Sequence, residues 1–252
     1  MMGETLHDEL RERGLFPHQV EFIETVLGSG SGCRLLLADA VGLGKTRACV
    51  ALVWAWSRLH GRQPRTLILA PRALLPMWQA SLANFEVVAD IVDAAKFRHV
   101  EARTPAGQNP WTSLDIVITT VDFLKRHDRV RTLLEVSWDL VIVDEAHMYT
   151  GASQAGQVLR ALWDADEVDV MVAASATPSG RLDDLVASTG DTVRVLRRSA
   201  TDLVDWEGRP ILGAEASQVV EIVRLQLTAR EHDLLEVTRS LLQRSATEDP
   251  SR

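Results

Sequence analysis

Short hydrophobic runs alternate with longer amphipathic stretches along most of this chain. The runs are rich in leucine and β-branched residues, and each ends at a turn or a polar residue. Such runs are typical of strands buried on both faces of a parallel sheet, and the stretches between them have helical spacing. We therefore expect an α/β fold with a doubly wound, mainly parallel sheet. The expected strands are Leu35–Ala38, Thr66–Ala70, Asp115–Thr119, Leu140–Val143 and Val168–Ala173, and the expected helices are Gln19–Leu27, Lys45–Leu59, Leu74–Phe85, Val130–Val136 and Gln154–Trp163.

Two regions depart from this alternation. Residues Ala94–Trp111 are polar and contain Pro105, Gly107 and Pro110, so we expect a surface loop there. After Pro178 the pattern weakens. The remaining expectations are one further strand over Val219–Leu227, a helix from Thr228 to about Gln243 that begins with a capping box, and a frayed tail.

Composition narrows the class of protein. The chain has 252 residues with a net charge of −8, which argues against a surface coated with phosphate-binding cations and leaves room for a local basic groove. Its two cysteines, Cys33 and Cys49, form neither a metal-ligand spacing nor a disulfide framework. The charged N-terminus does not resemble a signal peptide, and the longest apolar run, Ala48–Trp56, is far shorter than a membrane span. We expect a cytoplasmic protein that does not enter a membrane.

A glycine-containing turn joins the first expected strand to the helix that begins at Lys45. Gly42, Leu43 and Gly44 precede Lys45 and Thr46, and glycines let backbone amides face a phosphate without a Cβ in the way. The helix N-terminus adds its positive dipole end, Lys45 can reach the β- and γ-phosphates, and the Thr46 hydroxyl can hold Mg²⁺. The usual pattern has a glycine where Asp39 stands. A chance glycine-rich turn is the alternative, but the flanking strand and helix favour a nucleotide site.

Two carboxylates follow the strand Leu140–Val143. Side chains at the carboxyl end of a parallel strand point into the ligand crevice. Asp144 can bind Mg²⁺, Glu145 can orient and deprotonate an attacking water, and His147 is placed to sense both the nucleotide and neighbouring loops. Alone, such a pair is often a helix cap with a first-turn glutamate. The preceding phosphate loop favours catalysis.

Other strand ends carry polar residues whose ordinary function is capping. Ser175 and Thr177 can hydrogen-bond to the acidic loop and couple it to another site. Pro71, Arg72 and Thr119 can lie near a phosphate backbone.

Two further features lie outside these strand ends. Gln19 can place an amide near an adenine edge, although by itself it would be a helix surface residue. The basic cluster Arg194, Arg197 and Arg198 can face nucleic acid or a partner, and solvated surface is its default interpretation.

Taken in order, these motifs resemble the first RecA-like lobe of Swi/Snf-type ATPases in helicase superfamily 2. The nearest groups are bacterial, namely the RNA-polymerase-associated ATPase and the helicases of DISARM-type phage defence. In that family an aspartate is normal at the position of Asp39. The resemblance rests on Leu15–Ile23, Leu35–Thr46, Thr66–Leu82, Asp115–Arg126, Leu140–His147, Ser175–Pro178 and Leu196–Leu212.

The resemblance implies a P-loop NTPase fold that uses ATP and Mg²⁺. Gln19 would contact adenine, and Gly42, Leu43, Gly44, Lys45 and Thr46 would bind the nucleotide. Thr46 and Asp144 would hold Mg²⁺, and Lys45, Asp144 and Glu145 would be catalytic. His147, Ser175 and Thr177 would couple hydrolysis to movement, and Pro71, Arg72 and Thr119 would contact nucleic acid, with double-stranded DNA favoured.

The resemblance also implies a domain plan. Residues 1–196 would form the ATP-binding lobe with N-terminal helices, and residues 197–252 a linker toward a second RecA-like lobe that the chain does not contain. That lobe normally supplies arginines that reach the γ-phosphate. The family's usual acidic residue is replaced by Ala40, and the stretch from Pro178 to Arg197 is short for the family. The isolated chain is expected to turn over ATP slowly or not at all, and a partner chain is a candidate source of the second lobe. The alternatives are a non-catalytic nucleic-acid-binding or regulatory subunit, and a remnant of a longer helicase.

Overall fold

A central sheet of parallel strands organises the residues that the computed structural model describes, which are 4–176 and 193–211. Among these residues the sheet has seven strands in the order β3-β4-β2-β5-β6-β1-β7, and all neighbours are parallel. This confirms the predicted α/β fold with a doubly wound, parallel sheet. The strands are β1 (Cys33–Leu37), β2 (Thr66–Leu69), β3 (Asp90–Ile91), β4 (Ile116–Thr119), β5 (Trp138–Val143), β6 (Val168–Ala174) and β7 (Val193–Leu196).

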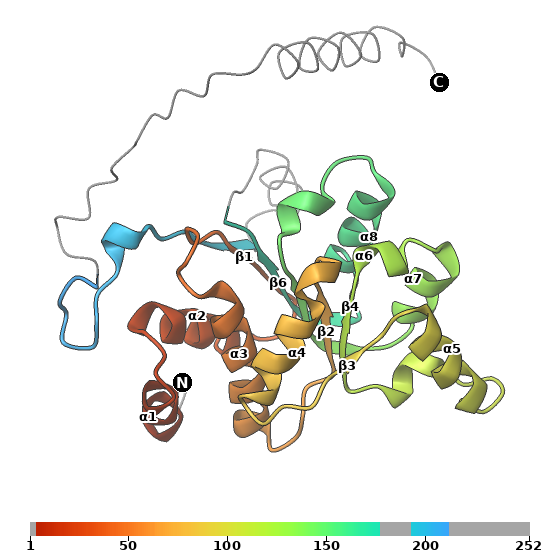
Figure 1. The fold of residues 1–252 in the computed structure, drawn as a ribbon, viewed down its shortest axis with the longest axis horizontal. Helices are drawn as coiled ribbons and strands as arrows, with labels where there is room; N and C mark the ends of the chain where they lie inside the picture. The colour runs from red at the N-terminus through yellow and green to blue at the C-terminus, as the bar shows by residue number, and fades with distance from the viewer. Residues whose placement is uncertain (1–3, 177–192, 212–252) are drawn as a thin grey trace, which may run out of the picture. The chain divides into compact units, whose positions relative to one another are not determined.

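Helices cover both faces of the sheet (Figure 1). Helices α1–α4 pack on one face and α5–α8 on the other, as the two hydrophobic clusters show. The helices are α1 (Glu4–Glu12), α2 (Pro17–Leu27), α3 (Lys45–His60), α4 (Leu75–Ala83), α5 (Ala94–Arg103), α6 (Val121–Leu124), α7 (His127–Leu133) and α8 (Gln154–Trp163), with the 3-10 turns η1 (Arg72–Leu74), η2 (Pro110–Ser113), η3 (Ala146–Tyr149) and η4 (Ala200–Asp202).

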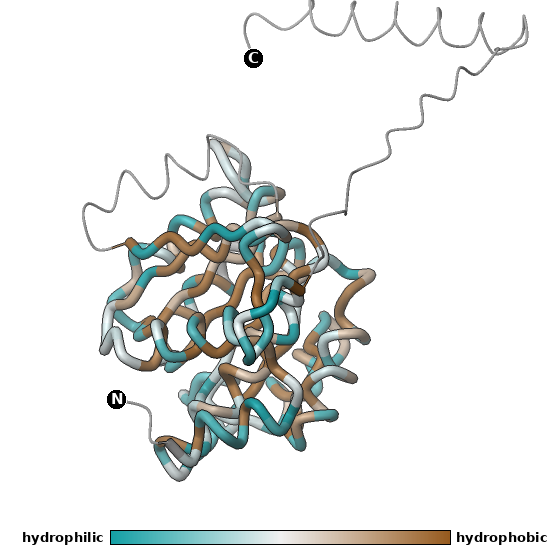
Figure 2. The backbone as a smooth tube through the Cα atoms, turned by 90° about the vertical axis from the view of Figure 1, so that its left-hand side faces the viewer, coloured by the Kyte–Doolittle hydropathy of each residue, from teal (hydrophilic) through white to brown (hydrophobic). Residues whose placement is uncertain are grey.

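Successive strand residues alternate between the two hydrophobic clusters. Leu35 and Leu37 pack with α1–α4, whereas Leu36 packs on the opposite side with α5–α8. Because successive strand side chains point to opposite faces, a strand covered on both faces must be apolar throughout. This is why the hydrophobic runs of the sequence are continuous. In Figure 2 the hydrophobic segments lie in the middle of the described part of the chain.

The predicted surface loop over Ala94–Trp111 is wrong for most of its length. Residues Ala94–Arg103 form α5, because the Asp93 side chain accepts hydrogen bonds from the amides of Ala95 and Lys96. Such an N-cap satisfies amides of the first turn that have no partner within the helix. Phe97 supplies the buried contact that docks this polar helix on the sheet.

Some expected features lie outside the described residues, and two observed strands were not expected. Thr177, the strand over Val219–Leu227 and the helix from Thr228 lie outside them. Strands β3 and β7 were not predicted, since β3 is very short and the residues of β7 are half-buried or exposed. The helices within residues 4–176 and 193–211 include none with both the length and the apolar character of a membrane span.

Candidate nucleotide-binding site

The sheet order brings three predicted motifs together. Strand β6 lies between β5 and β1, with Ala173 opposite Val143 and Ala174 opposite Leu37. The acidic pair follows β5, Ser175 follows β6, and the phosphate loop follows β1. Parallel strands end at one edge of the sheet, so the three motifs are neighbours there.

The phosphate loop has the backbone that its glycines permit. Gly42 and Gly44 have φ values of 86° and 75°, in the left-handed region that L side chains rarely adopt. Gly44 is the N-cap of α3 and provides no side-chain cap, so the first amides of this long helix remain available to an anion. Thr46 lies half-buried in the first turn.

Lys45 lies within the loop and close to the acidic pair. Its Nζ donates hydrogen bonds to the carbonyls of Asp39 at 2.8 Å and Ala40 at 3.1 Å. Burial lowers the pKa of Lys45, while the nearby carboxylates of Asp39, Glu145 and Asp144 oppose that shift. The predicted phosphate-binding cation and the predicted magnesium ligand therefore face the same crevice.

Helix α2 supports the far end of the loop. Gln19 Nε2 donates to the Leu43 carbonyl at 3.2 Å, and a ring nitrogen of His18 lies 3.0 Å from the same oxygen. Gln19 is only 3% exposed, so its alternative interpretation as a helix surface residue is wrong. Its Oε1 accepts from the Phe16 amide, and the whole side chain positions the loop. Contact with adenine stays a prediction.

The acidic pair is held by specific donors. Asp144 is 6% exposed, and its Oδ1 accepts from the Glu145 amide at 3.0 Å. Its Oδ2 accepts from the indole Nε1 of Trp78 on α4 at 2.9 Å. Glu145 has a φ of 49°, a backbone conformation that non-glycine residues seldom adopt and that clusters at functional sites.

His147 links the acidic pair to the end of β6. Its Nδ1 lies 3.3 Å from a carboxylate oxygen of Glu145 and 3.0 Å from the Ser175 hydroxyl. Ser175 is fully buried, and its amide donates to Leu37 at the end of β1. The predicted coupling residues His147 and Ser175 thus lie between the acidic pair and the phosphate loop.

The predicted nucleic-acid residues lie at the ends of β2 and β4. A cavity of about 640 Å³ there is lined by Arg72, Thr119 and the exposed Arg98 of α5. Thr119 itself is fully buried and its hydroxyl donates to the Val92 carbonyl at 2.6 Å, so this hydroxyl is not available to nucleic acid. Arg72 is exposed, and Pro71 caps η1 beside it.

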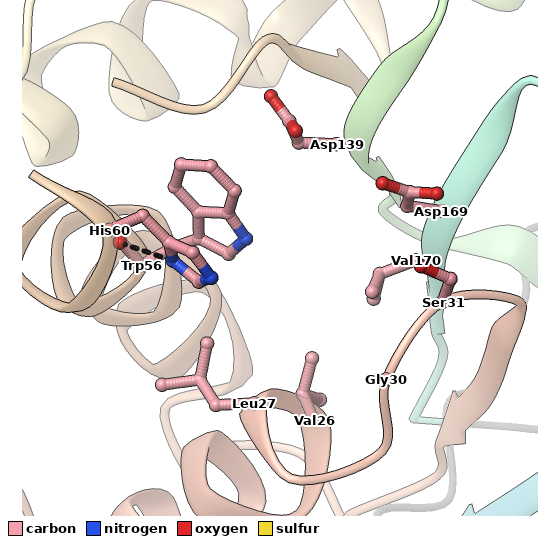
Figure 3. Close-up of a pocket in the computed structure, with 9 residues that line it drawn as sticks. All are labelled: Val26, Leu27, Gly30, Ser31, Trp56, His60, Asp139, Asp169 and Val170. Atoms are coloured by element: carbon pink, nitrogen blue, oxygen red, sulfur yellow. Dashed lines mark hydrogen bonds between the residues drawn. The ribbon is translucent and has the colours of Figure 1, made fainter. Parts of the chain in front are cut away.

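A second hollow lies at the opposite edge of the sheet. Figure 3 shows Trp56 and His60 facing Asp139 and Asp169, near the starts of β5 and β6. Its volume is about 160 Å³. Because it lies at the amino ends of the strands, it is separate from the phosphate loop.

Two residues of the site were not singled out as functional by the sequence motifs. Trp78 contacts Asp144, and Arg198 contacts Asp39. The default interpretation of Arg198 as solvated surface is wrong, since its side chain is only 14% exposed, whereas Arg194 and Arg197 are exposed. The departure from glycine at Asp39 was the available signal, because a buried carboxylate needs a partner.

The fold and the site define a P-loop, RecA-like nucleotide-binding lobe. Residues 18–185 match the model of the SNF2-related domain. This chain belongs to that family, whose fold is that of the nucleotide-binding lobes of nucleic-acid-dependent ATPases.

Curated relatives agree with this assignment. The chain is 34% identical over 170 residues to the RNA polymerase-associated protein RapA of Yersinia pestis (strain Pestoides F), and equally to RapA of Yersinia pseudotuberculosis serotype O:1b (strain IP 31758). Each match covers 65% of this chain and 17% of the relative. The chain therefore matches about a sixth of the length of these relatives.

Solved structures share the fold. The Sulfolobus solfataricus SWI2/SNF2 ATPase core in complex with dsDNA aligns with a TM-score of 0.54 and 19% identity, covering 76% of this chain and 47% of that one. The DUF1998 helicase MrfA bound to DNA aligns with a TM-score of 0.54 and 21% identity, covering 78% and 30%.

Proposed function

We propose that this chain is the ATP-binding lobe of a DNA-dependent ATPase that moves along double-stranded DNA together with a second RecA-like lobe. The observation that carries the proposal is the meeting of the phosphate loop, the acidic pair and Ser175 at one edge of the sheet. The alternative of a chance glycine-rich turn does not account for the acidic pair beside Lys45.

The residues present fit Mg-ATP. The amides from Gly42 to Thr46 would bind the phosphates, with Lys45 as a point charge that leaves the Asp39 and Ala40 carbonyls when phosphate enters. Thr46 and Asp144 would hold Mg²⁺, which neutralises charge on the phosphates when bound. Magnesium usually takes one or two protein ligands and completes its shell with phosphates and water.

Glu145 is the proposed general base. Its carboxylate would accept a proton from the water that attacks the γ-phosphate, while His147 holds that carboxylate in place through the 3.3 Å contact. The hydrogen bond between His147 and Ser175 would couple changes at the nucleotide site to the end of β6. Thr177, which lies outside the described residues, is also proposed to take part in this coupling.

The proposed nucleic-acid surface is the cavity at the ends of β2 and β4. Arg72 and Arg98 supply positive charge there, within a chain whose net charge is −8. Phosphate contacts dominate the affinity of proteins for DNA, and this affinity decreases as the salt concentration rises. Double-stranded DNA is proposed as the substrate because two proteins of similar fold are described with dsDNA or DNA. We further propose that the protein acts in the cytoplasm.

Nucleotide binding is tested by titrating Mg-ATP into the wild-type protein and the Lys45→Ala variant. Wild type should bind, and Lys45→Ala should lose most of the affinity. Lys96→Ala removes a lysine that pairs with Asp90 away from the loop, and should bind like wild type. If wild type and Lys45→Ala bind equally, the nucleotide site is wrong.

DNA binding is tested by salt-dependent titration of duplex DNA, single-stranded DNA and duplex RNA. Arg72→Ala and Arg98→Ala should each weaken duplex DNA binding and flatten its salt dependence. Arg103→Ala, on the same helix as Arg98 but outside the cavity, is the control. Preference for RNA would overturn the substrate assignment.

A catalytic lobe should hydrolyse ATP once arginines of a second lobe are supplied, and a regulatory subunit should not.

A further inference from the structure

The Arg198 side chain joins three separate parts of the nucleotide site. We propose that Arg198 is a positioning residue for ATP, which neutralises Asp39 and links the phosphate loop to helix α2 and to residues 197–211. The inference rests on the proposed nucleotide site, and it assigns a function to a residue that no phosphate-loop or acidic-pair motif contains.

Asp39 stands where a phosphate loop usually begins with glycine, and it needs a counter-ion. Its side chain is 4% exposed. Arg198 donates to both carboxylate oxygens: its amide and Nε each reach Oδ1 at 3.0 Å, and Nη2 reaches Oδ2 at 3.0 Å. A bidentate guanidinium with an added backbone donor fixes both the charge and the orientation of the carboxylate. The carboxylate is therefore occupied in anchoring the start of the loop.

The same guanidinium reaches helix α2. Its Nη1 donates to the His18 carbonyl and, at 2.9 Å, to a carboxylate oxygen of Glu21. Helix α2 supports the other end of the loop through Gln19 and the Leu43 carbonyl. Arg198 and Gln19 thus hold the two ends of one phosphate loop relative to one helix.

Arg198 also belongs to the segment that leaves the sheet. Strand β7 pairs with β1, and beyond it the Ala40 amide donates to the Arg198 carbonyl at 2.9 Å. Further along, Trp206 Nε1 donates to the Leu15 carbonyl at 2.9 Å, just before α2. A displacement of residues 197–211 would therefore move the backbone of the phosphate loop at Asp39 and Ala40.

Removal of Arg198 should change the nucleotide affinity in a predictable direction. Asp39 would remain as a buried carboxylate without its main donors, close to the site that must receive a triphosphate. An unpaired buried charge is costly, and like charges repel more strongly where water is excluded. Nucleotide affinity should fall even though Lys45, Thr46 and Asp144 are unchanged.

The first test is a Mg-ATP titration of Arg198→Ala against Arg197→Ala. The neighbouring Arg197 is exposed, so its removal takes away the same charge without touching Asp39. Arg198→Ala should bind about 10- to 100-fold more weakly, the effect expected for hydrogen bonds to a charged group. Arg197→Ala should bind like wild type. Equal, near-wild-type binding by both variants would overturn the proposal.

A double-mutant cycle separates positioning from a loss of folding. All variants are first compared by thermal unfolding and circular dichroism. In a folded set, Arg198→Ala combined with Asp39→Asn should bind better than Arg198→Ala alone, because the unpaired buried charge has been removed. Arg198→Lys should recover part of the affinity, since it restores a charge but not the bidentate geometry. If the second substitution brings no recovery, Arg198 does not act through Asp39. If Arg198→Ala does not fold, the folded Arg198→Lys variant decides: wild-type affinity there would overturn the proposal.

The linkage to residues 197–211 is tested by hydrogen exchange in the full chain. Mg-ATP should alter amide exchange of Arg198–Trp206 in wild type and not in Arg198→Ala at saturating nucleotide. No change in wild type would overturn the linkage. If wild type binds Mg-ATP and Lys45→Ala does not, a failure of these tests removes the Arg198 proposal alone. If wild type does not bind Mg-ATP, or binds it no better than Lys45→Ala does, the proposed function has failed.

Discussion

Nε1 of Trp78 donates a 2.9 Å hydrogen bond to Oδ2 of Asp144. Trp78 is fully buried on α4, the helix that follows the exposed Arg72, and Asp144 is the proposed magnesium ligand after β5. The indole therefore connects an element near the proposed DNA surface with the nucleotide site. Together with the Glu145 amide, which donates to Oδ1, it fixes the orientation of the Asp144 carboxylate.

Replacing Trp78 by phenylalanine should raise the Mg²⁺ concentration needed for ATP binding. The ring packing is largely kept, but Asp144 loses a donor that orients it, and such partners of metal ligands are typically worth about 10- to 100-fold in affinity. The measurement is a Mg²⁺ titration at fixed ATP.

Trp111→Phe provides the matched control for this prediction. Trp111 is equally buried, and its Nε1 donates to the Thr132 hydroxyl at 3.2 Å, away from the nucleotide. Both variants should lose similar stability, while only Trp78→Phe should change the Mg²⁺ requirement. A shared shift, or none in Trp78→Phe, would contradict the role of the indole.

The pH dependence of ATP binding should reveal Lys45. Burial lowers its pKa below the ordinary 10.5, so the ammonium loses its proton at lower pH than an exposed lysine does. Since ATP binds the charged form, affinity should be constant at neutral pH and should fall as the pH rises through the lowered pKa. Lys45→Arg stays charged, so its weaker affinity should remain level over the same range. Parallel declines in both proteins would assign the effect to another group.

Gly44→Ala and Gly42→Ala should differ in their effects. Both glycines have positive φ values, so alanine strains the backbone at either position by about 1 kcal/mol. A Cβ at Gly44 would also collide with Gln19 Nε2, whereas one at Gly42 would meet no atom within 4 Å. Gly44→Ala should thus displace Gln19 and lower both unfolding temperature and ATP affinity more than Gly42→Ala. Equal losses would show that Gln19 does not contribute to the loop.

Removal of Arg62 should have an effect that disappears in acid. Burial alone would raise the pKa of Asp139, but hydrogen bonds from Arg62 and from the Arg65 amide outweigh it, and the pKa lies below its ordinary 3.8. The stability from this carboxylate is therefore present above about pH 3.8 and is lost as the pH falls through the lowered pKa.

The measurement is urea unfolding of wild type and Arg62→Ala at neutral and acid pH. Because Arg62 is 59% exposed, solvent screens the pair and the difference in unfolding free energy at neutral pH should be small. It should shrink further in acid. Arg131→Ala, which removes an exposed ion pair of 3.9 Å, should change little at either pH. A difference that grows in acid would have the wrong sign.

The error over Ala94–Trp111 shows a limit of hydrophobic patterns. Helix α5 has few apolar residues, so its polar composition and the prolines after it favoured a loop. Its formation depends on the cap at Asp93 and on Phe97 packing against α6 and η2, with Phe123 and Trp111 within ring contact. Most helical stability in proteins comes from such packing rather than from intrinsic propensity.

The amino-acid sequence by itself determined the buried strands, the glycine turn before α3 and the carboxylates that follow β5, because these depend on residues close together in the chain. The tertiary structure alone decided which distant groups meet. Trp78 and Asp144 are 66 residues apart, and Asp39 and Arg198 are 159 apart. Both contacts arise from the order in which parallel strands pair, and strand order reflects packing of the whole sheet, which local patterns do not encode.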